Sequence, residues 1–114
     1  MNPSPLRVVA LGGTTRPDSS TERALRHALD AVAEAGAQVV LLTGDDLVLP
    51  MYAPHDPSRT PAALRLVAEL RRADGVIIAS PGYHGSLSGL IKNALDYVED
   101  LRNDARPYLS GRAV

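Results

Sequence analysis

Apolar residues gather in three short runs along the chain, at residues 6–11, 39–42 and 76–79. The runs consist mainly of Val, Leu, Ile and Ala, and polar residues follow each of them. The first run does not alternate between apolar and polar positions, as expected for a strand buried on both faces of a parallel sheet. The pattern therefore predicts three buried strands.

Apolar residues recur three or four positions apart after each run, which predicts three amphipathic helices. The first follows a polar loop and ends at Gly36, where a left-handed glycine commonly terminates a helix. The second covers 61–73 and begins with proline, a favourable first helical residue. The third carries its apolar stripe over 90–101, and the segment 47–61, with four prolines, is predicted as a long loop.

Strands that alternate with helices indicate an α/β domain, in which a parallel sheet lies between two layers of helices. Ligands in such folds bind beyond the carboxyl ends of the strands. The loops 12–21 and 80–88 both follow strands, so we expect them to line one crevice. The stretch after residue 103 is typical of a connector into a fourth strand, which only begins within the chain. We expect residues 1–114 to form a single domain.

Composition and charge narrow the classes of function. The chain carries 12 Lys and Arg against 13 Asp and Glu, a formal charge of -1, without the basic cluster that nucleic-acid binding requires. Neither a membrane-spanning apolar run nor a signal peptide is recognisable, which favours a cytoplasmic protein. The absence of cysteine excludes disulfides, thiolate nucleophiles and cysteine-based metal sites.

The first loop combines two glycines with hydroxyl groups and one arginine. Glycines permit a tight turn, while hydroxyls, the guanidinium and the first N–H groups of the next helix can bind a monophosphate. The spacing matches neither a Walker A loop nor the dinucleotide fingerprint GxGxxG. An ordinary helix-capping loop explains the same hydroxyls equally well. The candidate phosphate ligands are Thr14, Arg16, Ser19, Ser20 and Thr21.

The second loop is rich in glycine and carries one tyrosine. Its backbone can approach a flat ligand closely, its amides can bind ring carbonyls and nitrogens, and Tyr83 can lie against a ring. A serine hydrolase elbow needs GxSxG, but Leu87 occupies the central position here. His84 is either a general acid or a solvent-facing side chain. The candidate ring-binding residues are Pro81, Gly82, Tyr83, His84, Gly85 and Ser86.

Four residues, Asp45, Asp46, His55 and Asp56, resemble metal ligands in type only. Adjacent aspartates after a strand more often cap or solvate a turn, and no second cluster of ligands lies nearby in the sequence. We therefore predict that the protein has no metal site.

Together the two loops resemble the NADPH-dependent FMN reductase family of the flavodoxin-like superfamily. The family's first loop has the form G-S-x-R-x-x-S, and residues 13–19 match it with Thr14 in place of the first serine. The second signature is S-P-x-Y-x-x-S-x-x-G-x-x-K-N-x-x-D, and residues 80–96 match it at each defined position. Residues 49–52 are similar to the family's loop beside the flavin.

This resemblance implies a flavodoxin-like, doubly wound parallel sheet in a three-layer αβα arrangement, with three βα units and the start of a fourth strand present. It also implies that the first loop holds the phosphate of FMN and that residues 81–86 hold the edge of the isoalloxazine ring. NADPH or NADH would then reduce FMN, which would pass the electrons to a flavin, a quinone or another small acceptor. No catalytic side chain is expected, and the family implies a homodimer or homotetramer.

Two other functions remain open from the sequence. The chain is also compatible with an FMN-binding electron-transfer module that does not oxidise NAD(P)H. It is equally compatible with an inactive fragment that serves only as an assembly subunit, because the family's glycine-rich loop after the fourth strand is expected beyond residue 114.

Overall fold

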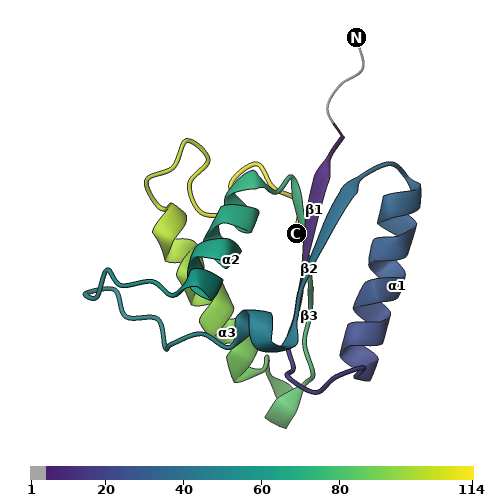
Figure 1. The fold of residues 1–114 in the computed structure, drawn as a ribbon, viewed down its shortest axis with the longest axis horizontal. Coiled ribbons are helices and arrows are strands. Elements are labelled where there is room, and N and C mark those ends of the chain that lie inside the picture. The colour runs from purple at the N-terminus through teal and green to yellow at the C-terminus, as the bar shows by residue number, and fades with distance from the viewer. Residues whose placement is uncertain (1–4) are drawn as a thin grey trace.

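The computed structural model describes residues 5–114, and Figure 1 shows one sheet with helices on both of its faces. The strands are β1 Arg7–Gly12, β2 Gln38–Leu42 and β3 Gly75–Ala79. All pairs are parallel and the order is β2-β1-β3, with Val9 opposite both Val40 and Val76. The predicted parallel α/β sheet is confirmed, and β1 lies at its centre.

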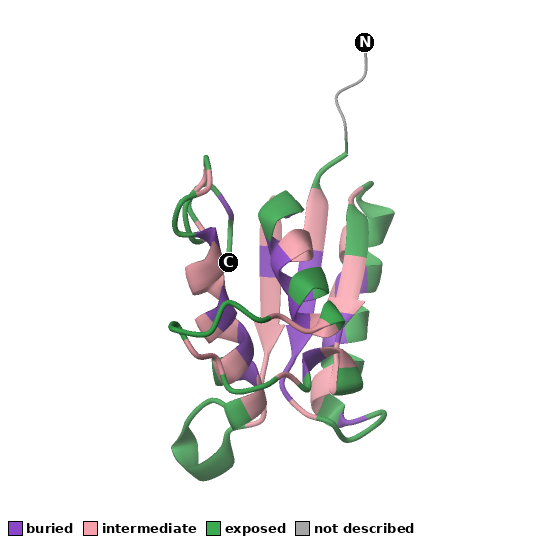
Figure 2. Ribbon diagram, turned by 60° about the vertical axis from the view of Figure 1, so that its left-hand side comes forward, coloured by how far each residue is buried: buried purple, intermediate pink, exposed green. Residues whose placement is uncertain are grey.

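The central strand is buried on both faces, as its continuous apolar run predicts. Val9, Ala10 and Leu11 are each 0% exposed. Val9 and Leu11 belong to the larger core cluster, whereas Ala10 packs with Leu25 and Leu29 on the opposite face. Figure 2 shows that buried residues follow the strands and the sides of the helices that face them.

Three helices cover the sheet: α1 Ser20–Glu34 on one face, and α2 Pro61–Arg72 and α3 Gly89–Asp96 on the other. Each begins after a residue whose side-chain oxygen accepts an N–H from the first turn, namely Ser19, Thr60 and Ser88. Gly36 has a φ of +101° just after the end of α1, so the predicted left-handed glycine is confirmed.

The third apolar stripe forms two kinds of helix. The α-helix α3 ends at Asp96, and the 3-10 helix η3 Tyr97–Leu101 continues the chain. The predicted helical stripe over 90–101 is thus divided between an α-helix and a 3-10 helix. Tyr97 and Leu101 are nevertheless buried, because a tighter turn over five residues still returns apolar side chains to the same side. Two further 3-10 turns lie within predicted loops, η1 Gly44–Leu47 and η2 Tyr83–Gly85.

The predicted start of a fourth strand is confirmed beside β3. Ala113 forms a parallel bridge with Gly75, in which its carbonyl accepts the N–H of Val76 at 2.8 Å. Its own N–H donates to the carbonyl of Asp74 at 3.1 Å. The order of pairing thus becomes β2-β1-β3 followed by the segment at Ala113, as a doubly wound sheet requires.

One buried arginine holds this C-terminal segment in place. Arg112 is 8% exposed, and its Nε and Nη2 donate at 2.8 Å to the carbonyls of Leu70 and Arg71 at the end of α2. Its Nη1 donates to three further carbonyls, those of Arg106, Tyr108 and Ser110. Burial lowers the pKa of this guanidinium, and the nearby charge of Arg106 adds to the effect. Arg112 therefore links the end of α2 to the turn that precedes the fourth strand.

Candidate functional site

Two adjacent glycines lie where the segments that follow all three strands meet. A Cβ atom on Gly12 would lie 2.7 Å from Thr43 Oγ1, and one on Gly13 would lie 2.7 Å from Ile91 Cγ1. Side chains do not tolerate such distances, so glycine is required for this close approach. The N–H of Gly13 donates to the carbonyl of Ala79 at 2.8 Å, which joins the first loop to the end of β3.

The first loop leads directly into α1. Ser19 is 6% exposed, and its Oγ accepts the N–H of Glu22 at 3.1 Å. The Glu22 carboxylate in turn accepts the N–H of Asp18 at 3.1 Å, where the backbone has a φ of +51°. The capping interpretation is therefore correct for Ser19. Its hydroxyl proton remains available for donation to a ligand, because the cap uses only the oxygen.

Several donors surround this turn. The N–H groups of Ser20 and Thr21 belong to the first turn of α1, where an α-helix leaves its N–H groups without intrahelical partners. Thr14 Oγ1 accepts the N–H of Arg16 at 3.2 Å and keeps its own proton. The Arg16 side chain is exposed and has no ion pair or side-chain hydrogen bond within residues 5–114. These groups, with the positive end of the helix dipole, fit a monophosphate.

The second loop is closed at its base by two serines. Ser88 donates its N–H to Ser80 Oγ at 2.9 Å, and Ser80 Oγ donates to the carbonyl of Pro81 at 2.9 Å. Ser88 Oγ accepts the N–H of Ile91 at 3.2 Å and lies 2.9 Å from the position of a Cβ on Gly13. The base of this loop is thereby fixed to α3 and to the first loop at once.

The tip of the second loop is exposed and tightly turned. His84 has a φ of +52° and Gly85 a φ of +79°, so the chain adopts left-handed conformations at two consecutive residues. The N–H groups of Gly85 and Ser86 donate to the carbonyls of Gly82 and Tyr83, both at 3.1 Å. Within the described chain, the N–H groups of residues 82–84 have no such partner. Three backbone donors are thus available to a ligand.

An open hollow of about 510 Å³ lies against this loop. It is lined by Ser80, Pro81, Gly82, Gly85, Ser86 and Leu87. Tyr83, which is 56% exposed, and His84, which is also exposed, are not among its lining residues. Four of the six predicted ring-binding residues therefore share one surface, and the other two stand beside it.

Asn93 has a role that the sequence analysis did not assign. Its Oδ1 accepts the N–H of Tyr52 at 2.9 Å, and its Nδ2 donates to the carbonyls of Pro50 at 3.0 Å and Leu49 at 3.3 Å. The hydroxyl of Tyr97 donates to the same Pro50 carbonyl at 2.8 Å. The helix that follows the second loop thus holds residues 49–52. The motif K-N-x-x-D includes Asn93 but gives no indication of its partners, which are backbone groups.

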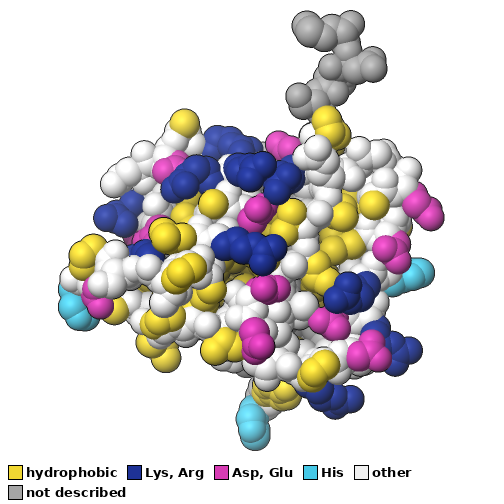
Figure 3. All heavy atoms as spheres, in the orientation of Figure 1, with side chains coloured by type: hydrophobic (Ala, Val, Ile, Leu, Met, Phe, Trp, Pro, Cys, Tyr) yellow, Lys and Arg dark blue, Asp and Glu magenta, His cyan; other side chains and the backbone are white. Residues whose placement is uncertain are grey.

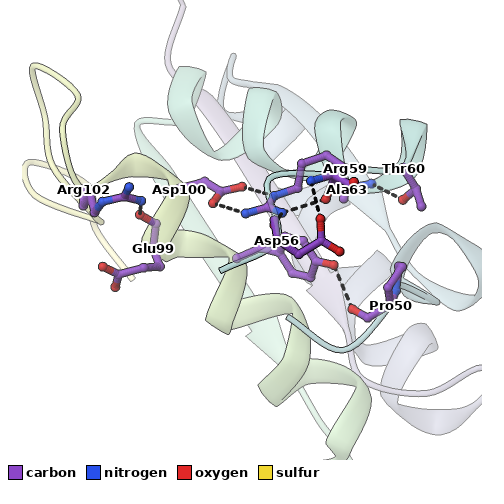
Figure 4. A network of polar contacts seen from close by, with 10 residues as sticks. Pro50, Asp56, Arg59, Thr60, Ala63, Glu99, Asp100 and Arg102 are labelled. Atoms are coloured by element: carbon purple, nitrogen blue, oxygen red, sulfur yellow. Dashed lines mark hydrogen bonds and ion pairs between the residues drawn. The ribbon is translucent and has the colours of Figure 1, made fainter. Parts of the chain in front are cut away.

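A second contact holds the same long loop further along (Figure 4). Arg59 donates from Nε and Nη2 to the two carboxylate oxygens of Asp100, at 2.6 and 2.8 Å. Its guanidinium carbon lies 5.3 Å from the ring centre of Tyr52 and 5.5 Å from that of Tyr97, within cation–π range. Its Nη1 also donates to the carbonyl of Asp56 at 2.8 Å.

The Arg59–Asp100 pair predicts a pH dependence of stability. The hydrogen bonds from Arg59 lower the pKa of Asp100 below its ordinary value of 3.8. A carboxyl whose pKa is lower in the folded than in the unfolded protein stabilises the fold fully at pH values above its unfolded-state pKa. This stabilisation is lost as the pH falls through the folded-state pKa. We expect Asp100→Asn to lower the free energy of unfolding by about 1.5 kcal/mol at pH 7. The difference from the parent should shrink below about pH 4, as urea titrations can measure.

Asp96→Asn is the matched control for this measurement. Asp96 pairs with Lys92 one helical turn away, and the two side chains are 38% and 64% exposed. Exposed pairs of this kind contribute about 0.5 kcal/mol or less. Equal losses at pH 7 for the two variants would contradict the role given to Asp100.

One of the candidate metal ligands, Asp46, has a structural role. Asp46 accepts the N–H of Thr43 at 3.2 Å and pairs with Arg65 at 3.3 Å, so it stabilises the turn at η1. Among residues 5–114, no three His, Asp or Glu side chains are grouped to hold a metal.

Basic and acidic side chains are interspersed on the face in Figure 3. The described helices include none with the length and apolarity needed to span a bilayer.

The sequence is similar to those of known flavin and quinone reductases. The family model described as NADPH-dependent FMN reductase matches residues 6–114. FMN reductase (NADPH) of Pseudomonas aeruginosa is 38% identical over 104 residues, which cover 84% of this chain and 53% of that protein. Quinone reductase of Escherichia coli is 35% identical over 98 residues, covering 84% of this chain and 52% of that protein.

A solved structure gives the same fold. The flavoenzyme FerB, an NAD(P)H:(acceptor) oxidoreductase from Paracoccus denitrificans, superposes with a TM-score of 0.67 at 29% identity. The superposition covers 93% of this chain and 54% of FerB. The chain thus spans about half the length of the relatives it matches. Since the match to the family model runs from residue 6 to residue 114, the chain belongs to the NADPH-dependent FMN reductase family.

Proposed function

We propose that the chain forms the FMN-binding part of an NAD(P)H-dependent oxidoreductase of the FMN or quinone reductase type. The observation that carries this proposal is the meeting of two loops at Gly13, one with donors for a phosphate and one with donors for a ring. The names of the relatives, FMN reductase and quinone reductase, support the same class of reaction.

The first loop would hold the phosphate of FMN. The ligands are the hydroxyls of Thr14 and Ser19, the first-turn residues Ser20 and Thr21, and the guanidinium of Arg16. The close approach of this loop to β3 supports the assignment, because it fixes the turn without using the Arg16 side chain. The charge of the guanidinium then remains available for a dianionic group.

The second loop would hold the edge of the isoalloxazine ring. Residues 81–86 offer the free N–H groups of Gly82, Tyr83 and His84 to the ring's carbonyls and nitrogens. Bound FMN would accept hydride from NADPH or NADH and pass electrons to a flavin, a quinone or another small acceptor. The protein's own contribution is binding and orientation, so we assign no catalytic side chain.

The remaining expectations about the whole protein belong to the same proposal. We expect residues 1–114 to act as one domain, the protein to be cytoplasmic, and the subunits to associate as a homodimer or homotetramer. Neither nucleic acid nor a membrane is needed for the proposed reaction.

The test is a titration of the purified chain with FMN, followed by anaerobic addition of NADPH. Binding that quenches flavin fluorescence, then bleaching of the flavin's visible absorbance, would support the reductase. Binding without bleaching by NADPH or NADH would favour the electron-transfer module. Failure to bind FMN, in this chain and in a longer chain that carries the remaining strands of the family fold, would overturn the proposal and favour an assembly subunit.

A further inference from the structure

The first turns of α3 contact all three segments that follow the strands. Ser88 bonds Ser80 in the second loop, and Ile91 lies against Gly13 of the first loop. Asn93, five residues after Ser88, bonds residues 49–52 beyond β2. Five residues of α-helix rise about 7.5 Å, so one short rigid element fixes the spacing of these segments.

Residues 49–52 depend on this helix for their conformation. They lie outside any helix or strand, and Tyr52 N–H and the carbonyls of Leu49 and Pro50 all bond to side chains of α3 or of the adjoining η3. The ring of Tyr52 packs edge-on against Tyr97 at 5.2 Å, while its neighbour Met51 is 79% exposed. Met51 thus presents an apolar, polarisable side chain to solvent, while side chains of α3 and η3 bind the backbone on either side of it.

We propose that Asn93 is a positioning residue for flavin: its amide holds residues 49–52 in place as a border of the ring-binding crevice. This inference rests on the proposed function and assigns Asn93 to the ring end of the ligand, away from the phosphate end at Arg16. Without the Asn93 amide, residues 49–52 would adopt the binding conformation only part of the time. The apparent affinity for flavin would then fall in proportion to that fraction.

The experiment compares Asn93→Leu with the parent chain in titrations with FMN and riboflavin. If the segment is ordered a tenth of the time in the variant, both dissociation constants rise about tenfold, and their ratio stays that of the parent. Hydrogen exchange of the Tyr52 N–H is expected to accelerate in parallel, because its acceptor is lost. Asn103→Leu, at an exposed turn, is the matched control and should change neither quantity.

Tyr97→Phe gives a second, conservative variant. It removes the hydroxyl that bonds Pro50 but keeps the ring beside Tyr52 and Arg59. We expect equal, smaller losses for the two flavins. Tyr108→Phe should bind as the parent does, because Tyr108 is exposed and its hydroxyl bonds Glu99 rather than residues 49–52.

The outcomes separate the two proposals. Faster exchange at Tyr52 with unchanged affinity for both flavins would make Asn93 merely structural and overturn the inference alone. A loss confined to FMN would also overturn it, since the effect would then act at the phosphate. Failure of the parent to bind either flavin would overturn the proposed function, and the inference would fall with it.

Discussion

Arg16→Ala should weaken binding of FMN about 10- to 150-fold and leave binding of riboflavin unchanged. Hydrogen bonds between a guanidinium and a phosphate contribute about 1.5–3 kcal/mol, and only FMN carries the phosphate. The Arg16 side chain is exposed and has no ion pair within residues 5–114, so its removal should not disturb the fold. Fluorescence titrations with the two flavins measure the difference directly.

Two further variants sharpen this test. Arg16→Lys keeps the charge but loses the planar fork, so FMN affinity should lie between those of the parent and of Arg16→Ala. Arg72→Ala removes an exposed arginine at the far end of α2 and should leave both affinities unchanged. Equal losses of FMN and riboflavin in Arg16→Ala would contradict the assignment of the phosphate to this loop.

Arg112→Met should lower the free energy of unfolding by about 2–4 kcal/mol, the largest effect on stability that we expect. Methionine fills a similar volume but removes the charged donor that five carbonyls share. The Leu70 carbonyl keeps the N–H of Ala73 and the Arg71 carbonyl keeps Nη2 of Arg106, so the loss comes from the hydrogen bonds to the charged guanidinium, which contribute about 1.5–3 kcal/mol. Urea unfolding at pH 7 would report it as a lower midpoint.

Arg102→Met is the control for this variant. Arg102 is exposed, and within residues 5–114 its side chain bonds only the carbonyl of Glu99, three residues earlier. Exposed substitutions of this kind change stability by about 0.5 kcal/mol or less. Similar midpoints for the two variants would show that the carbonyls around Arg112 find water when the arginine is removed.

The apolar pattern predicted the sheet and its helices because burial alone determines both. Residues 9–11 of the first run are buried, with side chains on both faces of the sheet, and the stripe after residue 61 packs on the sheet through Leu66 and Leu70. The 3-10 turns escaped prediction because they are too short for a hydrophobic period to develop. The end of α3 at Asp96 was missed for the same reason.

In the candidate site, too, some features could be predicted from the sequence and others could not. Residue types and spacing located both loops, since glycines and hydroxyls after buried strands are local features of the sequence. Asn93 and Arg112 could not be assigned this way, because their main partners are backbone groups about 40 residues away in sequence. Backbone N–H and C=O groups are nearly the same in every residue type, so the sequence does not indicate which of them a side chain will bond.

The central position of β1 also bears on the order in which the sheet forms. It pairs with β2 across 31 residues of sequence and with β3 across 67, so the second closure costs about 0.7 kcal/mol more in chain entropy. The β1–α1–β2 unit is therefore expected to form first, and the contact between Gly13 and Ala79 to form late. A ligand that spans the two loops would stabilise interactions that are absent from the folding transition state. It would thus prolong the lifetime of the native state without accelerating folding.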